Sequence, residues 1–277
     1  MESKKKYRNS LVIFVDMLGT QSKRDINSLY SDYSIFHSTL LEKDNKYIND
    51  GRSESILSGE KIRIHVHSFS DCAYVLYTYE NESLNSESDK GLLIDNALCH
   101  FERIILKLLE EAIVFRGGVS YGEVFYEKDK NILFGSAVNE AFRLEDTDAK
   151  NPRILVSTDV ADAYNRHYQQ CVEKFDHPST DMEKYMRDIL RSEGIENLKE
   201  SQGRIIIEDN FDGKYIFNYL NSVNTVDYIG IPEIETFTGD FKEDLYKFTL
   251  GKLNEKEIQE NPKVREKYEW LINYILA

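Results

Sequence analysis

The sequence is poor in the features that mark several large protein classes. Its 277 residues include only 3 cysteines and 4 prolines. Cys72, Cys99 and Cys171 lie far apart and show no metal-ligand spacing, which argues against a disulfide framework and a zinc module and predicts buried free thiols. No apolar run approaches the roughly 20 residues that a membrane-spanning helix needs. We therefore expect a cytoplasmic protein with no membrane contact.

Positive charge is also scarce. The 35 lysine and arginine residues face 49 aspartate and glutamate residues, which gives a formal net charge of -14. A protein that binds nucleic acid duplexes needs basic surface to neutralise phosphates, so we expect no nucleic acid partner. An acidic protein that handles an anionic nucleotide usually uses bound cations and a few placed arginine or lysine side chains.

The order of the apolar segments predicts an α/β fold. Strands are expected at 10–15, 61–69, 72–79, 114–121, 122–126 and 153–157, and helices at 21–48, 91–113, 136–148 and 158–168. This β-α-β-β-α-β order predicts a ferredoxin-like α/β sandwich. Weaker patterns predict a helix near 180–193, a hairpin made by 204–208 and 214–220, and helices at 240–253 and 261–276.

Two aspartates each close an apolar strand. Asp16 ends the run Leu11-Val-Ile-Phe-Val, and Asp71 follows the strand that starts near Ile64. If the strands are neighbours, the two carboxylates meet at one edge and repel each other unless a cation neutralises them. Mg²⁺ suits such a pair, because it takes one or two carboxylates and leaves other positions for phosphate and water. Ordinary turn chemistry would explain either aspartate alone.

An amide and a guanidinium project from one face of the predicted helix 136–148. Asn139 and Arg143 are four residues apart, which is about one helical turn. Side by side, these groups are suited to an oxyanion, above all the charge that develops during phosphoryl transfer. Gly135, just before the helix, would let the backbone approach a ligand. Nearby acids, Glu140, Glu145, Asp146 and Asp148, are expected on a solvated helix face.

Together these segments resemble the class III nucleotidyl cyclase catalytic domain over about residues 10–160. Phe14-Val-Asp16-Met17-Leu-Gly19 matches the first metal motif of that family, and Asp71 fits its second metal aspartate at a hairpin tip. The run from Arg116 to Val124 matches its glycine-rich strand. The run from Gly135 to Leu144 matches Gly-x-x-Val-Asn-x-Ala-x-Arg-Leu at every fixed position.

The resemblance implies a homodimer with composite active sites and a nucleoside triphosphate substrate. Asp16, Asp71 and the main-chain carbonyl of Met17 would bind two Mg²⁺ or Mn²⁺ ions per site. Asn139 and Arg143 of the other protomer would orient the ribose and stabilise the transition state. The ribose 3′-oxygen would attack the α-phosphate, giving pyrophosphate and a 3′,5′-cyclic nucleotide. Residues 1–170 would form the cyclase catalytic domain, and residues 171–277 an extension of the same domain, made of a hairpin plus helices.

The base-reading positions match neither purine class. Adenylyl cyclases of this family carry a lysine four residues before the second metal aspartate and an aspartate seven residues before the asparagine, and guanylyl cyclases carry glutamate and cysteine. This chain has His67 and Ile132 there. The motifs Val-Asp-Met-Leu-Gly and Arg-Gly-Gly-Val-Ser-Tyr-Gly look more like the Pycsar-type pyrimidine cyclases of bacterial anti-phage signalling. That likeness implies a cyclic UMP or cyclic CMP product that acts on a separate effector protein. We expect UTP in preference to CTP, but no residue decides between the two.

Three further residues are candidates for substrate contact, namely Gly19, Arg116 and Tyr121. Arg116 could equally pair with a surface carboxylate at the start of its strand. Two alternatives to the main interpretation stay open. One is an adenylyl or guanylyl cyclase, and the other is a non-catalytic nucleotide sensor on the same fold.

Overall fold

The computed structural model describes residues 6–19, 25–49, 60–192, 204–220 and 240–277. Within these ranges nine strands form one sheet in the order β2-β3-β4-β1-β5-β7-β9-β8, with β6 beside β5. The strands are β1 (Arg8–Met17), β2 (Tyr47–Asn49), β3 (Lys61–Phe69), β4 (Cys72–Tyr79), β5 (Phe115–Glu127), β6 (Ile132–Gly135), β7 (Ile154–Val156), β8 (Ile206–Glu208) and β9 (Tyr215–Phe217). The helices are α1 (Ile26–Leu41), α2 (Glu87–Glu110), α3 (Ser136–Arg143), α4 (Thr158–Asp176), α5 (Asp181–Ser192), α8 (Asp240–Leu253), α9 (Lys256–Gln259) and α10 (Pro262–Leu276).

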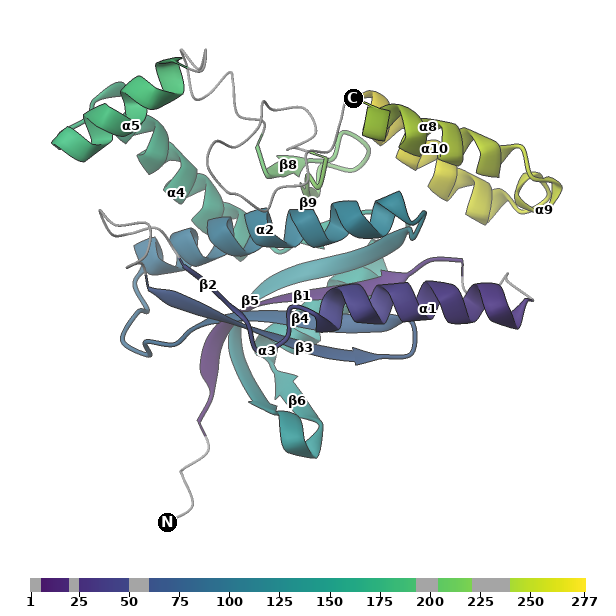
Figure 1. The fold of residues 1–277 in the computed structure, drawn as a ribbon, viewed down its shortest axis with the longest axis horizontal. Coiled ribbons are helices and arrows are strands. Elements are labelled where there is room, and N and C mark those ends of the chain that lie inside the picture. Colours follow the sequence, from purple (N-terminus) through teal and green to yellow (C-terminus); the bar gives the residue numbers. More distant parts are fainter. Residues whose placement is uncertain (1–5, 20–24, 50–59, 193–203, 221–239) are drawn as a thin grey trace.

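The predicted α/β class and ferredoxin-like core are confirmed. Strands β3, β4, β1 and β5 lie side by side and every neighbouring pair is antiparallel. Helix α2 crosses one face of this sheet, with α1 on the same side of the core (Figure 1). β7 joins β5 in parallel, so the sheet is mixed.

Strand β1 is buried on both faces, which explains its unbroken apolar run. Leu11, Ile13 and Val15 pack in the core beneath α1 and α2. Val12 and Phe14 point the other way and pack against α3. Alternate side chains of a strand face opposite sides, so both helical layers fix this strand. The position of its final residues is therefore set by the whole core.

The predicted helix 21–48 is wrong at its C-terminal end. α1 stops at Leu41, and Tyr47–Asn49 forms an edge strand paired with β3. Asn45 has a φ of 57°, a left-handed conformation that asparagine tolerates and a helix does not. Residues 21–24 of the predicted helix lie outside the described ranges.

Other boundaries also differ from the predictions, and α4 extends to Asp176 where the helix was expected to end at 168. The strands expected at 114–121 and 122–126 are one strand, β5, and the short strand β6 was not predicted. α2 begins at Glu87, because Ser86 and Asp89 form a capping box. The helix expected at 136–148 ends at Arg143 and continues as a π-helical segment, Leu144–Asp148.

The C-terminal hairpin joins the main sheet. β9 pairs with β7 through Leu155 and Ile216, and β8 follows as the edge strand. α8 and α10 lie against each other beyond the hairpin (Figure 1). These positions confirm the predicted hairpin and helices, while the division of the chain near residue 170 stays a prediction. Among the described helices none is long and apolar enough to cross a membrane.

Candidate active site

Asp16 and Asp71 meet where β1 ends. Asp16 lies opposite Cys72 in the β1–β4 register, and Asp71 occupies the tight turn just before Cys72. The main-chain N–H of Met17 donates a hydrogen bond of 2.8 Å to the carbonyl oxygen of Asp71. Burial raises the pKa of Asp16, and the charge of Asp71 raises it further. The two predicted metal ligands are therefore neighbours, although 54 residues separate them in the sequence (71 − 16 − 1).

A third carboxylate, that of Glu145, belongs to the same cluster. Arg116 joins it to Asp16, because its Nε lies 3.2 Å from Asp16 Oδ2 and 2.6 Å from Glu145 Oε1. Glu145 is only 3% exposed, and burial, opposed by Arg116 and aided by Asp16, raises the pKa of its carboxyl to about 7. The predicted solvated face is wrong for this residue. Its helical spacing from the buried Val138 and Ala141 was the available signal.

Two roles were predicted for Arg116, substrate contact and pairing with a surface carboxylate. In the structure its side chain pairs with carboxylates. Its partners belong to the acid cluster rather than to the open surface, since Asp16 and Arg116 face each other across β1 and β5. Negative charge is concentrated here. Burial, with the charges of Asp16, Asp71 and Glu145, raises the pKa of the Cys72 thiol to about 12. Cys72 is thus a protonated, buried thiol.

The acid cluster fits Mg²⁺ or Mn²⁺ by the chemistry of its donors. Asp16 and Asp71 supply hard carboxylate oxygens beside the main chain of Met17. No group of three or more His, Cys, Asp or Glu side chains within the described ranges is arranged to hold a metal alone. Mg²⁺ does not require one, because it commonly binds one or two carboxylates and completes its octahedron with phosphate oxygens and water.

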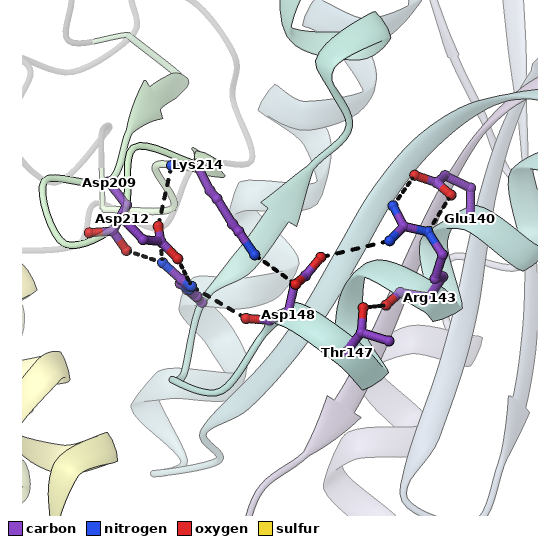
Figure 2. Close-up of polar contacts among 8 residues, drawn as sticks. Glu140, Arg143, Thr147, Asp148, Asp209, Asp212 and Lys214 are labelled. Carbon is purple, nitrogen blue, oxygen red and sulfur yellow. Dashed lines mark hydrogen bonds and ion pairs between the residues drawn. The ribbon is translucent and has the colours of Figure 1, made fainter.

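Asn139 and Arg143 both lie exposed on α3, which confirms that they occupy one helix. α3 packs directly on β5, since a Cβ atom added to Gly118 would lie 2.1 Å from the carbonyl oxygen of Ala141. Arg143 is held by Glu140, at 2.8 Å through Nε and 2.7 Å through Nη2 (Figure 2). Its Nη1 also lies 3.8 Å from Asp148 Oδ2.

The backbone of Gly135 comes close to another part of the protein. Its approach to a ligand stays a prediction. An added Cβ would lie 2.1 Å from the carbonyl oxygen of Glu123, and the φ of Gly135 is +150°. Glycine is needed here because β6 runs against β5 immediately before α3 begins.

Ion pairs connect the end of α3 to the C-terminal hairpin (Figure 2). Asp148 pairs with Lys214 at 2.7 Å. Arg153, which is 2% exposed, pairs with Asp209 at 2.5 Å and with Asp212 at 2.6 Å. The β8–β9 hairpin is thereby fixed beside the π-helical segment that carries Glu145.

The other residues predicted to contact the substrate lie on different elements of the fold. Gly19 lies in the turn after β1 with a φ of +86°. His67 is half-buried on β3 with its ring 6.3 Å from that of Tyr126, and burial lowers its pKa. Ile132 begins β6.

The structure does not bring Tyr121 to the acids. It faces Leu11 in the β1–β5 register, five positions along the strand from Arg116, and Lys90 of α2 lies 4.9 Å from its ring centroid. A strand rises about 3.4 Å per residue, so Tyr121 is about 17 Å from Arg116 along β5.

Comparisons with known proteins give structural likeness only. No protein-family model matches the chain, and no curated protein does. Among solved structures, the adenylyl cyclase CyaB from P. aeruginosa is 15% identical with a TM-score of 0.37, over 59% of this chain and 84% of that chain. A bacterial light-regulated adenylyl cyclase is 18% identical with a TM-score of 0.35, over 58% and 81%. The catalytic core of a rhodopsin-guanylyl cyclase with converted specificity, in complex with ATPαS, is 14% identical with a TM-score of 0.37, over 77% and 98%. With TM-scores this low, the functional argument rests on the chain's own residues.

Proposed function

We propose that this protein is a nucleotidyl cyclase, which converts a nucleoside triphosphate into a 3′,5′-cyclic nucleotide and pyrophosphate. The observation that supports it most is the meeting of Asp16 and Asp71 at the end of β1, tied by the Met17–Asp71 main-chain hydrogen bond. Paired carboxylates at a strand end, together with an exposed amide and guanidinium on one helix, supply the two halves of a phosphoryl-transfer site.

Asp16, Asp71 and the main-chain carbonyl of Met17 would hold two Mg²⁺ or Mn²⁺ ions. Such ions, when bound, neutralise phosphate charge and favour ionisation of the attacking ribose hydroxyl. Asn139 orients the ribose, and Arg143 stabilises the negative charge that grows on the oxygens of the α-phosphate. Arg143 is available for this because its own side chain is exposed and its partners Glu140 and Asp148 are only partly buried, and ion pairs near the surface cost little to break.

The proposed assembly is a homodimer with two equivalent composite sites. Each site takes the acids of one protomer and Asn139 and Arg143 of the other, and two-fold symmetry makes the two sites equivalent. Exposed aromatic side chains support a contact at this surface. Phe69 and Phe142 are 48% and 46% exposed, and the ring of Phe142, on α3, lies 5.5 Å from that of Phe14 on β1.

The proposed substrate is a pyrimidine nucleotide, UTP in preference to CTP. Support comes from the lack of both purine-reading pairs at His67 and Ile132, because a buried polar pair rejects a base that cannot complete its hydrogen bonds. The product would act on a separate effector protein, in a role in anti-phage defence.

The direct test is product identification by mass spectrometry after incubation with each of the four NTPs and Mg²⁺ or Mn²⁺. We expect one dominant cyclic pyrimidine monophosphate. A purine product would refute the base assignment and leave the cyclase proposal standing. Binding of NTP without any cyclic product would refute the cyclase proposal in favour of a nucleotide sensor.

Subunit mixing tests the composite site. Asp16→Ala and Arg143→Ala damage different halves, so each variant alone should be inactive. Half of the dimers in an equal mixture are mixed, and each mixed dimer keeps one intact site of two. The mixture should therefore regain about a quarter of wild-type activity. Persistent inactivity despite proven subunit exchange contradicts the shared site.

A further inference from the structure

The proposed cyclisation leaves one buried acid of the cluster, Glu145, without a role. Glu145 is 3% exposed and lies in the π-helical segment that follows α3. Its Oε1 atom lies 2.6 Å from Arg116 Nε. Burying a carboxylate is costly unless the group is paired, so the contact with Arg116 is what makes this position tolerable.

The main chain holds Glu145 in a fixed place beside β5. At Gly118 of β5 the π-helical segment approaches so closely that an added Cβ atom would lie 2.9 Å from Leu144 Cβ. The N–H of Ala149 donates a hydrogen bond of 3.0 Å to the carbonyl oxygen of Leu144, which closes a π-helical turn around Glu145. Such turns are rare and frequently lie at functional sites. The Glu145 carboxylate therefore meets Arg116 from a position that close backbone packing sets.

The Arg116 guanidinium is shared between two carboxylates. Its Nε donates a hydrogen bond of 3.2 Å to Asp16 Oδ2. Glu145 Oε1 is nearer, at 2.6 Å, yet among the described residues this buried oxygen has no aligned hydrogen-bond donor. It can therefore accept the Arg116 N–H when Asp16 no longer does, in a charge-assisted hydrogen bond.

Asp16 is also the first ligand of the proposed metal site. Arg116 and a divalent ion therefore compete for the same carboxylate, and the two cations repel each other at short range. Glu145 reduces the cost of this exchange, because a partly buried guanidinium that leaves Asp16 keeps a carboxylate partner. Without the charge of Glu145, Arg116 would depend on Asp16, and separating that pair would leave an uncompensated cation.

We propose that Glu145 is a positioning residue, which holds Arg116 and thereby frees Asp16 for a divalent ion. The inference rests on the proposed cyclase function, because it takes Asp16 as a metal ligand. It adds that the affinity of the site for the ion is set in part by a residue that does not contact the ion. Loss of the Glu145 charge should weaken metal binding, and it should do so only while Arg116 is present.

The test introduces Glu145→Gln into the wild-type chain and into an Arg116→Gln chain. A glutamine amide at position 116 can still donate to Glu145, but it carries no charge that competes for Asp16. The control is Asp146→Asn, which removes the same charge from an exposed neighbour in the same segment. The readouts are the dissociation constant of Mn²⁺, from the electron paramagnetic resonance signal of the free ion, and the Mn²⁺ concentration that gives half-maximal cyclisation.

Glu145→Gln should raise the Mn²⁺ dissociation constant about 10-fold, which is within the range of coupling between residues of one ion-pair network. In the Arg116→Gln chain the same substitution should change it by less than about twofold. Asp146→Asn should leave it within about twofold of wild type. If Glu145→Gln does not fold, Glu145→Asp takes its place with the same expected direction, because its shorter side chain keeps the charge but withdraws it from Arg116.

Each outcome has one meaning. A dissociation constant for Glu145→Gln within about twofold of wild type would overturn the role of Glu145. Equal weakening with and without Arg116 would also overturn it, because the charge would then act on the ion directly. Wild-type protein that binds Mn²⁺ but forms no cyclic nucleotide refutes the cyclase proposal, and the Mn²⁺ constants still decide the role of Glu145. Wild-type protein that binds no Mn²⁺ refutes that role, while product identification decides the cyclase proposal separately.

Discussion

Replacing Arg153 by methionine should destabilise the protein strongly. The guanidinium group is buried and pairs with Asp209 at 2.5 Å and Asp212 at 2.6 Å. Arg153→Met leaves Asp209, only 8% exposed, as a buried charge without its main partner. Removing one member of a buried ion pair costs about 3–5 kcal/mol. In a chain of this size each kcal/mol lowers the melting temperature by about 2 °C, so we expect a fall of about 6–10 °C.

The matched control is Arg166→Met. Arg166 pairs with Glu87 at 2.6 Å, an equally short contact, but the two side chains are 53% and 70% exposed. Exposed pairs contribute about 0–1 kcal/mol, so this melting temperature should fall by at most about 2 °C. Adding Asp209→Asn to Arg153→Met should recover part of the loss, since no unpaired charge then remains at residue 209. Calorimetry that finds the two arginine variants within about 1 kcal/mol of each other would refute the argument from burial.

Three further predictions concern packing, protonation and the acids. Gly118→Ala should cost about 1–3 kcal/mol in chemical unfolding, because its Cβ meets the carbonyl of Ala141 at 2.1 Å, whereas Gly251→Ala, with nothing within 4 Å, should be neutral or stabilising. Burial lowers the pKa of His100 from 6.5 to about 4, so only the unfolded chain takes up this proton between those pH values. Stability should therefore fall by about 3 kcal/mol as pH drops through that window, and urea titrations of His100→Gln should show that much less loss. Asp16→Asn should lower the rate of cyclisation by at least about a hundredfold. The melting temperature should not fall, because burial raises the pKa of this carboxyl and so disfavours its charged form in the folded protein. A lower melting temperature would show that Asp16 stabilises the fold.

The parts of the fold that the sequence predicts well have long, regular patterns. The hairpin expected at 61–69 and 72–79 matches β3 and β4 to the residue. β2 and β6 have three and four residues, too few for their period to show. α1 ends at Leu41, and the left-handed conformation of Asn45 shortly after it is a backbone feature that apolar periodicity does not report.

In the site, too, residues that belong to a sequence motif were predicted, and a residue outside the motifs was not. The motifs indicated Asp16 and Asp71, and the β1–β4 register brings them together. Glu145 was misassigned because its charge suggested solvent, although its helical spacing places it among buried residues.

The edges of the sheet bear on how two copies of this chain associate. β2 at one edge and β8 at the other are three residues long, and β6 has only four. Strands this short offer few unpaired main-chain groups on which a second molecule could build a continuous sheet. Beyond the three residues that β2 covers, β3 itself forms the edge, and there the side chain of Asp44 accepts the main-chain N–H of Val66. A side-chain cap of this kind takes a main-chain donor away from any added strand, so replacing Asp44 would expose that part of the edge.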